Sequence, residues 1–266
     1  LHCMTLTLNI IVFFSASALI AWSGTKLAMY ADRLADRTGL GEAVTGTVFL
    51  GFVTALPGLA AAVTAALQGH PALAISSAIG GIAIQTVFLA LADITYTRAN
   101  LEHAAASVAN MIQTIMLIIL LTLVLAGLAG PETSIVTVHP MTPLLILSAG
   151  GGFALVYRAS QEPMWNPRMT TFTVEDTPET QNISASLLKL VLGFFAIAIL
   201  VTAAGALVAH TAGNITEKTG LSETIAGGLF VGIATSLPAL VTTVAAVRRR
   251  ALTLAVGDIV GGNMFD

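Results

Sequence analysis

Charged residues are scarce in this chain, and their scarcity determines the solvent in which it folds. Only 9% of the 266 residues are Asp, Glu, Lys or Arg, whereas 56% are hydrophobic. Roughly a quarter of the residues of an ordinary soluble domain are charged, and a chain with so few cannot cover its surface with polar groups. The composition excludes a soluble domain and indicates a lipid bilayer as the solvent.

Cysteine and clustered basic residues are also nearly absent. The single cysteine, Cys3, excludes an internal disulfide. The eleven Lys and Arg residues lie at the ends of apolar segments and in connections, so the net charge of −3 indicates no nucleic-acid partner. Ten-residue segments of alternating hydrophobicity, which are typical of outer-membrane barrels, are missing, and this absence favours helices.

Long apolar segments dominate what is present. Each has about 17 to 25 residues, which as a helix is enough to cross a hydrocarbon core about 30 Å thick. The segments predict membrane spans at residues 5–30, 43–67, 71–96, 104–128, 141–157, 184–210 and 222–247, with an eighth that begins near 251. Three prolines mark residues 158–183 as an aqueous loop. We therefore expect an all-α polytopic membrane protein with units at 1–157, 158–183 and 184–266.

The basic residues predict the orientation of these spans, because Lys and Arg gather in short cytoplasmic loops. If the N-terminus lies outside, every basic residue except Lys218 falls on the cytoplasmic side. The three tyrosines fall at the cytoplasmic ends of spans one, three and five, where amphipathic rings favour the headgroup level. We expect an integral multi-pass protein of the plasma (inner) membrane with its N-terminus outside.

The second half of the chain repeats part of the first. At a constant offset of 181 residues, residues 34–85 align without gaps on residues 215–266, and glycines, prolines and threonines are identical at matched positions. An odd number of spans separates the copies, so the same hairpin enters the membrane once from each side. The sequence predicts two inverted-topology repeats of five helices each. A second repeat of full length would reach about residue 338, so we expect it to be incomplete here.

Matched prolines, Pro57 and Pro238, lie in the middle of spans two and seven. Because proline removes an intrahelical hydrogen bond, we expect both helices to open there and to free carbonyl oxygens for a cation. Hydroxyl groups of Thr54, Thr235 and Ser236 lie beside these prolines and are ligands that Na⁺ and Ca²⁺ accept. A kink that only serves close helix packing is the alternative.

The spans that follow contain polar residues in apolar surroundings. Gln85 and Asp266 occupy matched positions, and Asp258 and Asn263 lie on the same last span. Acids inside a membrane are functional by default. Asp266 is the stronger candidate, because Asp258 lies about two turns from the cytoplasmic end and is compatible with a water-filled entrance.

The segments GFVTALPG and GIATSLPA, each followed about twenty residues later by a Gly-Gly helix, resemble the sodium/calcium exchanger family of the cation/calcium antiporter superfamily. The resemblance covers most of the chain and implies ten spans in two inverted repeats. It also implies a cation site near the midplane, between two motifs of the type Gly-Thr-Ser-x-Pro-Glu. Carried over by position, the site contains Thr54, Ala55, Gly58, Gly81 and Gln85 from one repeat, and Thr235, Ser236, Ala239, Gly262 and Asp266 from the other.

Both motif glutamates are missing, since Gly58 and Ala239 stand at their positions. Ca²⁺ usually needs several oxygens and more than one carboxylate, so a site with about one negative charge suits Na⁺ or a proton better. We expect a secondary antiporter rather than an enzyme, which moves Ca²⁺ or another cation against Na⁺ or H⁺. Small cations and the bilayer are the expected partners, with no cofactor, no nucleic acid and no protein partner. A transport-inactive membrane interaction or regulatory protein is the alternative.

Overall fold

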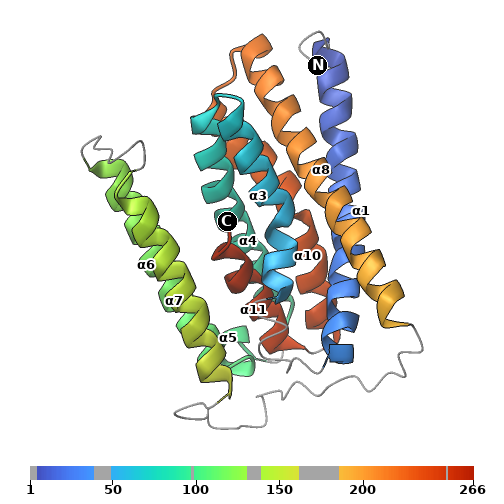
Figure 1. Ribbon diagram of the computed structural model, residues 1–266, viewed down its shortest axis with the longest axis vertical. Helices are drawn as coiled ribbons and strands as arrows, with labels where there is room; N and C mark the ends of the chain where they lie inside the picture. Colours follow the sequence, from blue (N-terminus) through green and yellow to red (C-terminus); the bar gives the residue numbers. More distant parts are fainter. Residues whose placement is uncertain (1–4, 39–48, 97–98, 131–138, 162–185, 250) are drawn as a thin grey trace.

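The computed structural model describes residues 5–38, 49–96, 99–130, 139–161, 186–249 and 251–266, and within these ranges all regular elements are helices (Figure 1). They are α1 (Leu6–Thr38), α3 (Gly51–Leu67), α4 (Pro71–Thr95), α5 (Leu101–Ala104), α6 (Val108–Ala129), α7 (Met141–Gln161), α8 (Leu187–Thr219), α9 (Glu223–Ile225), the π-helix η2 (Ala226–Val231), α10 (Gly232–Arg249) and α11 (Leu252–Asn263). In the described part of the chain, six segments are long and apolar enough to cross a membrane. The predicted all-α membrane protein is confirmed.

The outer surface of the bundle is apolar. On α6, Ile115, Ile118 and Leu125 are each more than half exposed. Such a surface would be unfavourable in water, but it is the expected surface of a helix that contacts lipid. The chain is therefore an integral membrane protein.

Two helices are longer than the spans predicted from hydropathy. α1 continues to Thr38 rather than ending near residue 30, and α8 continues to Thr219 rather than ending near residue 210. Each helix has 33 residues, which is about 50 Å at 1.5 Å per residue. Both continue past the apolar core as polar helix, and α8 ends only at Gly220, whose φ of 70° terminates helices. The end of α7 at Gln161 likewise lies beyond the expected boundary at residue 157.

The helices of the two halves correspond at the register read from the sequence. α1 and α8 have bounds exactly one offset of 181 apart, and α3 and α4 begin 181 residues before α10 and α11. In Figure 1, α1 descends from the N-terminus at the top, whereas α8 ascends, and the pairs α3 with α10 and α4 with α11 also run in opposite directions. This arrangement is consistent with the predicted inverted repeat.

Glycine–proline contacts recur in both halves. A Cβ atom on Gly24 of α1 would overlap the ring of Pro238, and one on Gly205 of α8 would overlap the carbonyl oxygen of Pro57. The two glycines are 181 residues apart, as are the two prolines. Each long helix therefore lies against the proline of the opposite half, at a distance that only glycine allows.

Glycine–glycine contacts recur in the same way. A Cβ atom on Gly51 would lie 2.6 Å from the nitrogen of Gly262, and one on Gly232 would lie 3.0 Å from the nitrogen of Gly81. These contacts join α3 to α11 and α10 to α4. Small residues let membrane helices approach closely, and in this fold they fix how the two halves interlock.

The prolines do not open their helices, which corrects the sequence-based expectation. α3 and α10 are each helical throughout, with Pro57 and Pro238 inside them. Irregularity occurs one to two turns earlier, where η2 precedes α10 and residues 49–50 form a π turn before α3. The irregular backbone thus lies before each proline and not at it.

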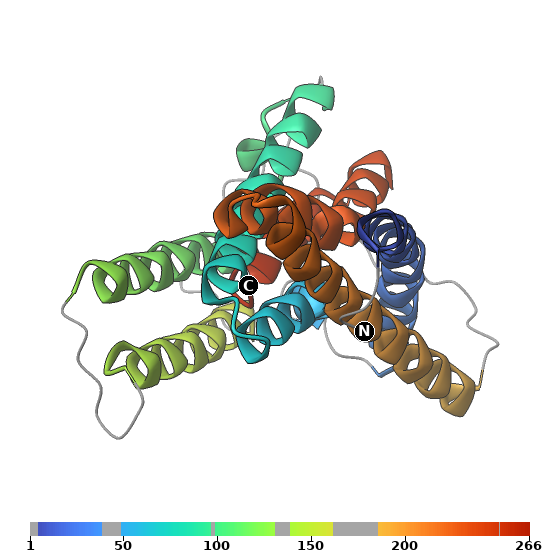
Figure 2. The same ribbon diagram turned by 90° about the horizontal axis from the view of Figure 1, so that it is seen from above.

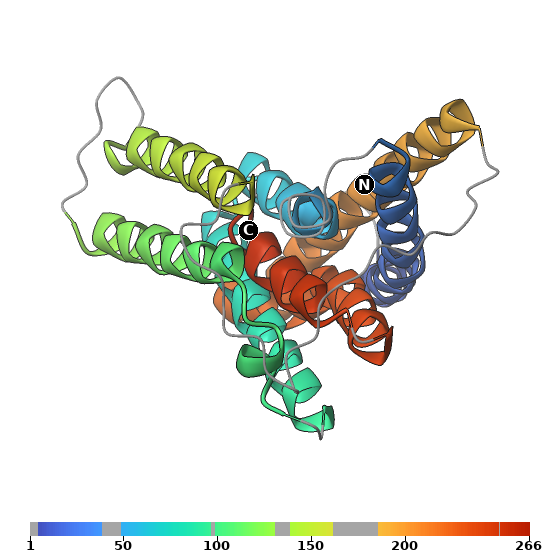
Figure 3. The ribbon, with the colours of Figure 1, turned by 90° about the horizontal axis from the view of Figure 1, so that it is seen from below.

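Four helices, α3, α4, α10 and α11, form the centre of the bundle (Figures 2 and 3). The antiparallel pair α1 and α8 covers one side, through contacts of α8 with α3 and of α1 with α10. α6 and α7 form a separate hairpin that reaches the centre through α11. Seen from below in Figure 3, α11 (red) lies between α6 and α10.

Basic residues gather at one end of the bundle. Arg37 and Arg158 lie in the last turns of α1 and α7, and Lys189 and Arg248 lie near the ends of α8 and α10 that face the same way. Lys218 lies at the opposite end, in the last turn of α8. The grouping agrees with the predicted topology, whereas the assignment of this end to the cytoplasm stays a prediction.

Candidate cation site

Two polar residues at matched positions meet at the centre of the bundle. Gln85 projects from α4, and Asp266 follows the end of α11, where its N–H bonds the carbonyl of Gly262 at 3.3 Å. Nε2 of Gln85 donates to Oδ2 of Asp266 at 2.7 Å. Gln85 belongs to the first half and Asp266 is its counterpart in the second, 181 residues later. Their contact therefore joins the two halves of the protein. The sequence prediction named both residues.

Space beside Asp266 is left by two glycines of the first half. A Cβ atom on Gly58 would lie 2.7 Å from Oδ1 of Asp266 and 3.9 Å from the hydroxyl of Thr235. A Cβ atom on Gly81 would lie 3.6 Å from Oδ2 of Asp266 and 3.7 Å from the hydroxyl of Ser236. Three side chains of the second half therefore present oxygens to the space that these glycines leave.

The second half leaves a matching space at Gly262. A Cβ atom there would lie 3.3 Å from Oε1 of Gln85 and 3.6 Å from the hydroxyl of Thr54. Gly262 is the counterpart of Gly81, and the oxygens it faces come from the first half. The site is therefore bounded by five oxygen-bearing side chains, two from one half and three from the other: Thr54, Gln85, Thr235, Ser236 and Asp266.

Two of these oxygens find no hydrogen-bond partner among the described residues. They are Oε1 of Gln85 and the hydroxyl of Ser236, in side chains that are 3% and 1% exposed. Buried polar atoms are almost always satisfied, by protein, water or an ion. Unpaired oxygens beside a carboxylate are the atoms that a cation would use.

Asp258 is more deeply placed than the sequence suggested. From the sequence, Asp258 was compatible with a position in a water-filled entrance. In the structure it is only 1% exposed, and both of its carboxylate oxygens accept hydrogen bonds. Thr54 donates to Oδ1 at 2.9 Å from α3, and Thr242 donates to Oδ2 at 2.5 Å from α10. The two helices cover this position because α11 runs between them, which hydropathy cannot show.

The threonines connect Asp258 to the rest of the site. Thr54 touches Asp258 on one side and faces the space beside Gly262 on the other. Each threonine hydroxyl has one hydrogen, and each also lies within hydrogen-bond distance of backbone carbonyls of its own helix. A carboxylate is the stronger acceptor, so these hydrogens go to Asp258 when it is ionised.

The remaining predicted positions contribute less. Ala55 and Ala239 are buried and carry no side-chain oxygen. Asn263 is 3% exposed, and its side-chain oxygen has no partner among the described residues. Thr242 was not predicted, because its counterpart in the first half is Ala61 and only the crossing of α10 with α11 brings it to Asp258.

Two acids, the buried Asp258 and the partly exposed Asp266, thus lie in the bundle with no basic partner among the described residues. The ion pairs found within the described ranges involve neither Asp258 nor Asp266. Removing a carboxylate from water is costly unless an opposite charge compensates it, and inside a membrane such a residue marks an ion or substrate pathway. The arrangement can hold a cation with one or two negative charges and several neutral oxygens.

A polytopic helical fold with an oxygen-lined centre defines a membrane transporter. The chain belongs to the sodium/calcium exchanger protein family, whose model matches residues 8–140 and 189–266. The resemblance read from the sequence is confirmed, and the family consists of transporters rather than enzymes.

Individual relatives support the same family. The chain is 27% identical over 253 residues to the putative antiporter CaxA of Alkalimonas amylolytica, a match that covers 93% of this chain and 74% of the relative. It is 23% identical over 248 residues to the inner membrane protein YrbG of Escherichia coli (strain K12), covering 93% of this chain and 73% of that protein.

Solved structures show the same fold. A structure of the sodium-calcium exchanger NCX_Mj matches with a TM-score of 0.59 and 17% identity, covering 98% of this chain and 79% of that one. A structure of native YfkE matches with a TM-score of 0.60 and 16% identity, covering 97% and 70%. The predicted exchanger fold is thereby confirmed.

Proposed function

We propose that this chain carries the transport site of a secondary cation antiporter, and that Gln85 and Asp266 form its centre. The observation that carries the proposal is their 2.7 Å contact at matched positions of the two halves. Around it lie the partnerless oxygens of Gln85 and Ser236, both buried. A cation bound there would contact both halves at once, as a site between repeats requires.

Alternating access follows if α1 and α8 slide across the four central helices. These two long helices contact each other more extensively than any other pair, so they can move as one body. Each also touches a central proline through a glycine, so no side chain of the long helix at that point stands between it and the central helix. We infer that the protein resides in the inner membrane with its N-terminus outside, as its basic residues indicate.

The ligand set favours a monovalent cation. Asp266 is the only acid that borders the space beside the glycines, and the other four groups are neutral hydroxyls or an amide. Ca²⁺ takes six to eight oxygens and is commonly held by more than one carboxylate. We propose that Na⁺ or H⁺ is bound in preference to Ca²⁺, with Asp258 as a second, more distant negative charge.

Ion flux in proteoliposomes tests this proposal. The Asp266→Asn variant keeps the size of the side chain and removes its charge, and we expect its flux to fall to that of empty liposomes. Asp93→Asn is a matched control, because Asp93 accepts a hydrogen bond from the N–H of Leu101 at 2.7 Å and an asparagine oxygen can replace it. Unchanged flux in the Asp266 variant would place the site elsewhere.

A transport-inactive membrane protein is the competing function, and the absent glutamates favour it. The Gly58→Glu, Ala239→Glu double variant separates the two. The first glutamate can enter only if Asp266 moves, because its Cβ would lie 2.7 Å from Oδ1 of that residue. Ca²⁺ exchange that appears only in the double variant, with no flux in the parent protein, would identify an exchanger that has lost its activity.

A further inference from the structure

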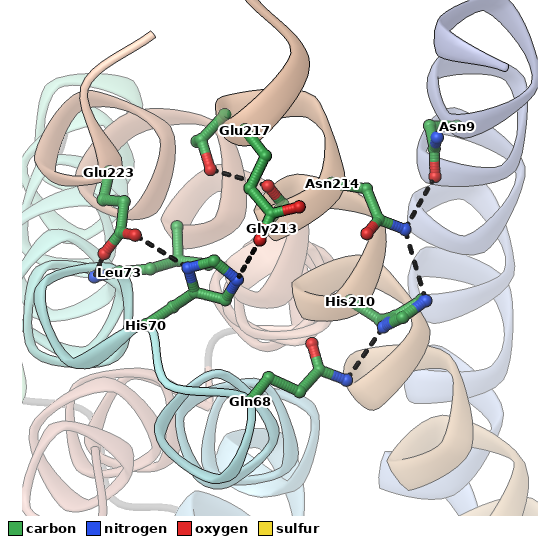
Figure 4. A network of polar contacts seen from close by, with 10 residues as sticks. Asn9, Gln68, His70, Leu73, His210, Gly213, Asn214, Glu217 and Glu223 are labelled. Atoms are coloured by element: carbon green, nitrogen blue, oxygen red, sulfur yellow. Dashed lines mark hydrogen bonds and ion pairs between the residues drawn. The ribbon is translucent and has the colours of Figure 1, made fainter. Parts of the chain in front are cut away.

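A second polar cluster (Figure 4) lies around the turn between α3 and α4, at the end of the bundle opposite the last turns of α1, α7 and α10 (Figure 1). At its centre is His70, in the turn between α3 and α4, whose side chain is 13% exposed. Around it the network joins α1, α3, α4, α8 and α9 through these side chains: Asn9, Gln68, His210, Asn214, Glu217 and Glu223.

Both ring nitrogens of His70 face carboxylates. Nδ1 lies 2.7 Å from Oε1 of Glu223 on α9, and Nε2 lies 3.6 Å from Oε1 of Glu217 on α8. The Cδ2–Nε2 edge of the ring also lies against Gly213 of α8, where a Cβ atom would come within 2.9 Å of it. His70 therefore connects a turn of the first half to two elements of the second.

The 2.7 Å contact places a proton on Nδ1, and a carboxylate 3.6 Å from Nε2 favours a second proton there. A neutral imidazole has one N–H and one lone pair, so one of the two carboxylates would face a lone pair and be repelled. With both nitrogens protonated, the ring is a cation between two anions. We propose that His70, Glu217 and Glu223 form a proton-binding site that latches α8 to the α3–α4 turn.

Loss of the proton should release α8 and leave α9 in place. Glu223 is held independently, because its Oε2 accepts the N–H of Leu73 at 3.2 Å. Glu217 is 53% exposed, so its carboxylate can turn into water when Nε2 carries no proton and the ion pair is lost. The contact with α8 is therefore the one that depends on the proton.

Other titratable groups near the latch are accounted for. His210 of α8 has its nitrogens 2.8 Å from Nε2 of Gln68 and 3.2 Å from Nδ2 of Asn214. Both neighbours are amides, which can donate or accept and so suit either protonation state of the ring. Lys218 follows Glu217 and is exposed. The facing groups of α1 and α3, Asn9 and Gln68, are neutral.

The latch exists at only one end of the protein. The residue 181 positions after His70 is Ala251, which has no proton to lose. Asn214 also bonds Asn9 at 3.1 Å, so α1 follows α8 when the latch opens or closes. Protons on this side of the membrane would therefore control the pair of helices that covers the central bundle, independently of which ion the protein carries.

Distance measurements between spin labels test the latch without any transport assay. Labels are placed on Leu67→Cys and Thr219→Cys, the last residues of α3 and α8, in the full-length protein with Cys3→Ser, in lipid nanodiscs. At about pH 5.5 we expect a narrow distance distribution, and at about pH 8.5 a broader one with a longer mean. The same distribution at both pH values would overturn the proposal.

Variants identify the group responsible. His70→Gln should show the broad distribution at both pH values. Glu217→Gln should show the narrow one at both, because an amide can accept from Nε2–H or donate to its lone pair. His210→Asn is the matched control and should retain the full response to pH. A response that survives His70→Gln, or that disappears in His210→Asn, would assign the effect to another group and refute the latch.

Discussion

The hairpin of α3 and α4 and the hairpin of α10 and α11 have the same backbone plan but different polar side chains. Gly51, Pro57 and Gly81 recur at matched positions as Gly232, Pro238 and Gly262 and make matched contacts. The acids do not recur, because both acids of the centre belong to the second hairpin. Among the matched positions that differ, first hairpin before second, are Ala55 and Ser236, Ala61 and Thr242, Ser77 and Asp258, and Gln85 and Asp266.

The difference shows which constraints act on each half. Close helix contacts are needed on both sides of the bundle, so the small residues that allow them are present twice. A carboxylate near the interface of the halves serves the whole site, so one copy is sufficient. A second carboxylate there would add repulsion unless a divalent ion compensated it.

Moving the central acid from one half to the other tests this comparison most directly and has the largest expected effect. Asp266→Gln alone should abolish cation flux in proteoliposomes, because the site loses its charge. The double variant Gln85→Asp, Asp266→Gln again has one acid and one amide, with their positions exchanged. We expect it to recover measurable flux. Loss of flux in both variants would show that the halves are not interchangeable at the site.

Matched glycines test whether the steric contacts are equivalent. Gly205→Leu and Gly24→Leu should each lower the free energy of unfolding by about 3 kcal/mol, because the new side chains overlap Pro57 and Pro238. Thermal unfolding in detergent measures the effect. Gly150→Leu is the control, since nothing lies within 4 Å of a Cβ atom at that position. A large effect at only one of the two glycines would break the equivalence of the halves.

The hydrogen bond that only the second hairpin makes should have the smallest effect. Thr242→Val leaves Oδ2 of Asp258 without its hydroxyl donor, and we expect a loss of about 1 kcal/mol in unfolding free energy. Thr122→Val is the control, because its hydroxyl bonds only the carbonyl of Ile118 on an exposed face. Equal stability of the two variants would mean that Thr242 does not stabilise the carboxylate.

Much of this fold could be predicted from the sequence, because apolar length fixes the spans and the 181-residue register fixes their correspondence. The pairing of Gln85 with Asp266 was also inferred from that register. The expectation that the helices open at Pro57 and Pro238 was wrong, because α3 and α10 stay helical through these residues. The position of Asp258 was misjudged because its burial depends on Thr54 of α3 and Thr242 of α10. Thr54 lies far from Asp258 in sequence, and Thr242 lies on a helix that crosses α11.

The sequence by itself determined the solvent, the helical class, the places of the long helices and the absence of both motif glutamates, because these depend on residue type and spacing alone. Tertiary structure decided which oxygens share a space, which acid is buried and how His70 lies between two carboxylates. Those relations depend on distances between residues about 150 to 200 positions apart, which only the packing of one half against the other sets. A register can pair two residues, but a contact at 2.7 Å exists only once the helices have packed.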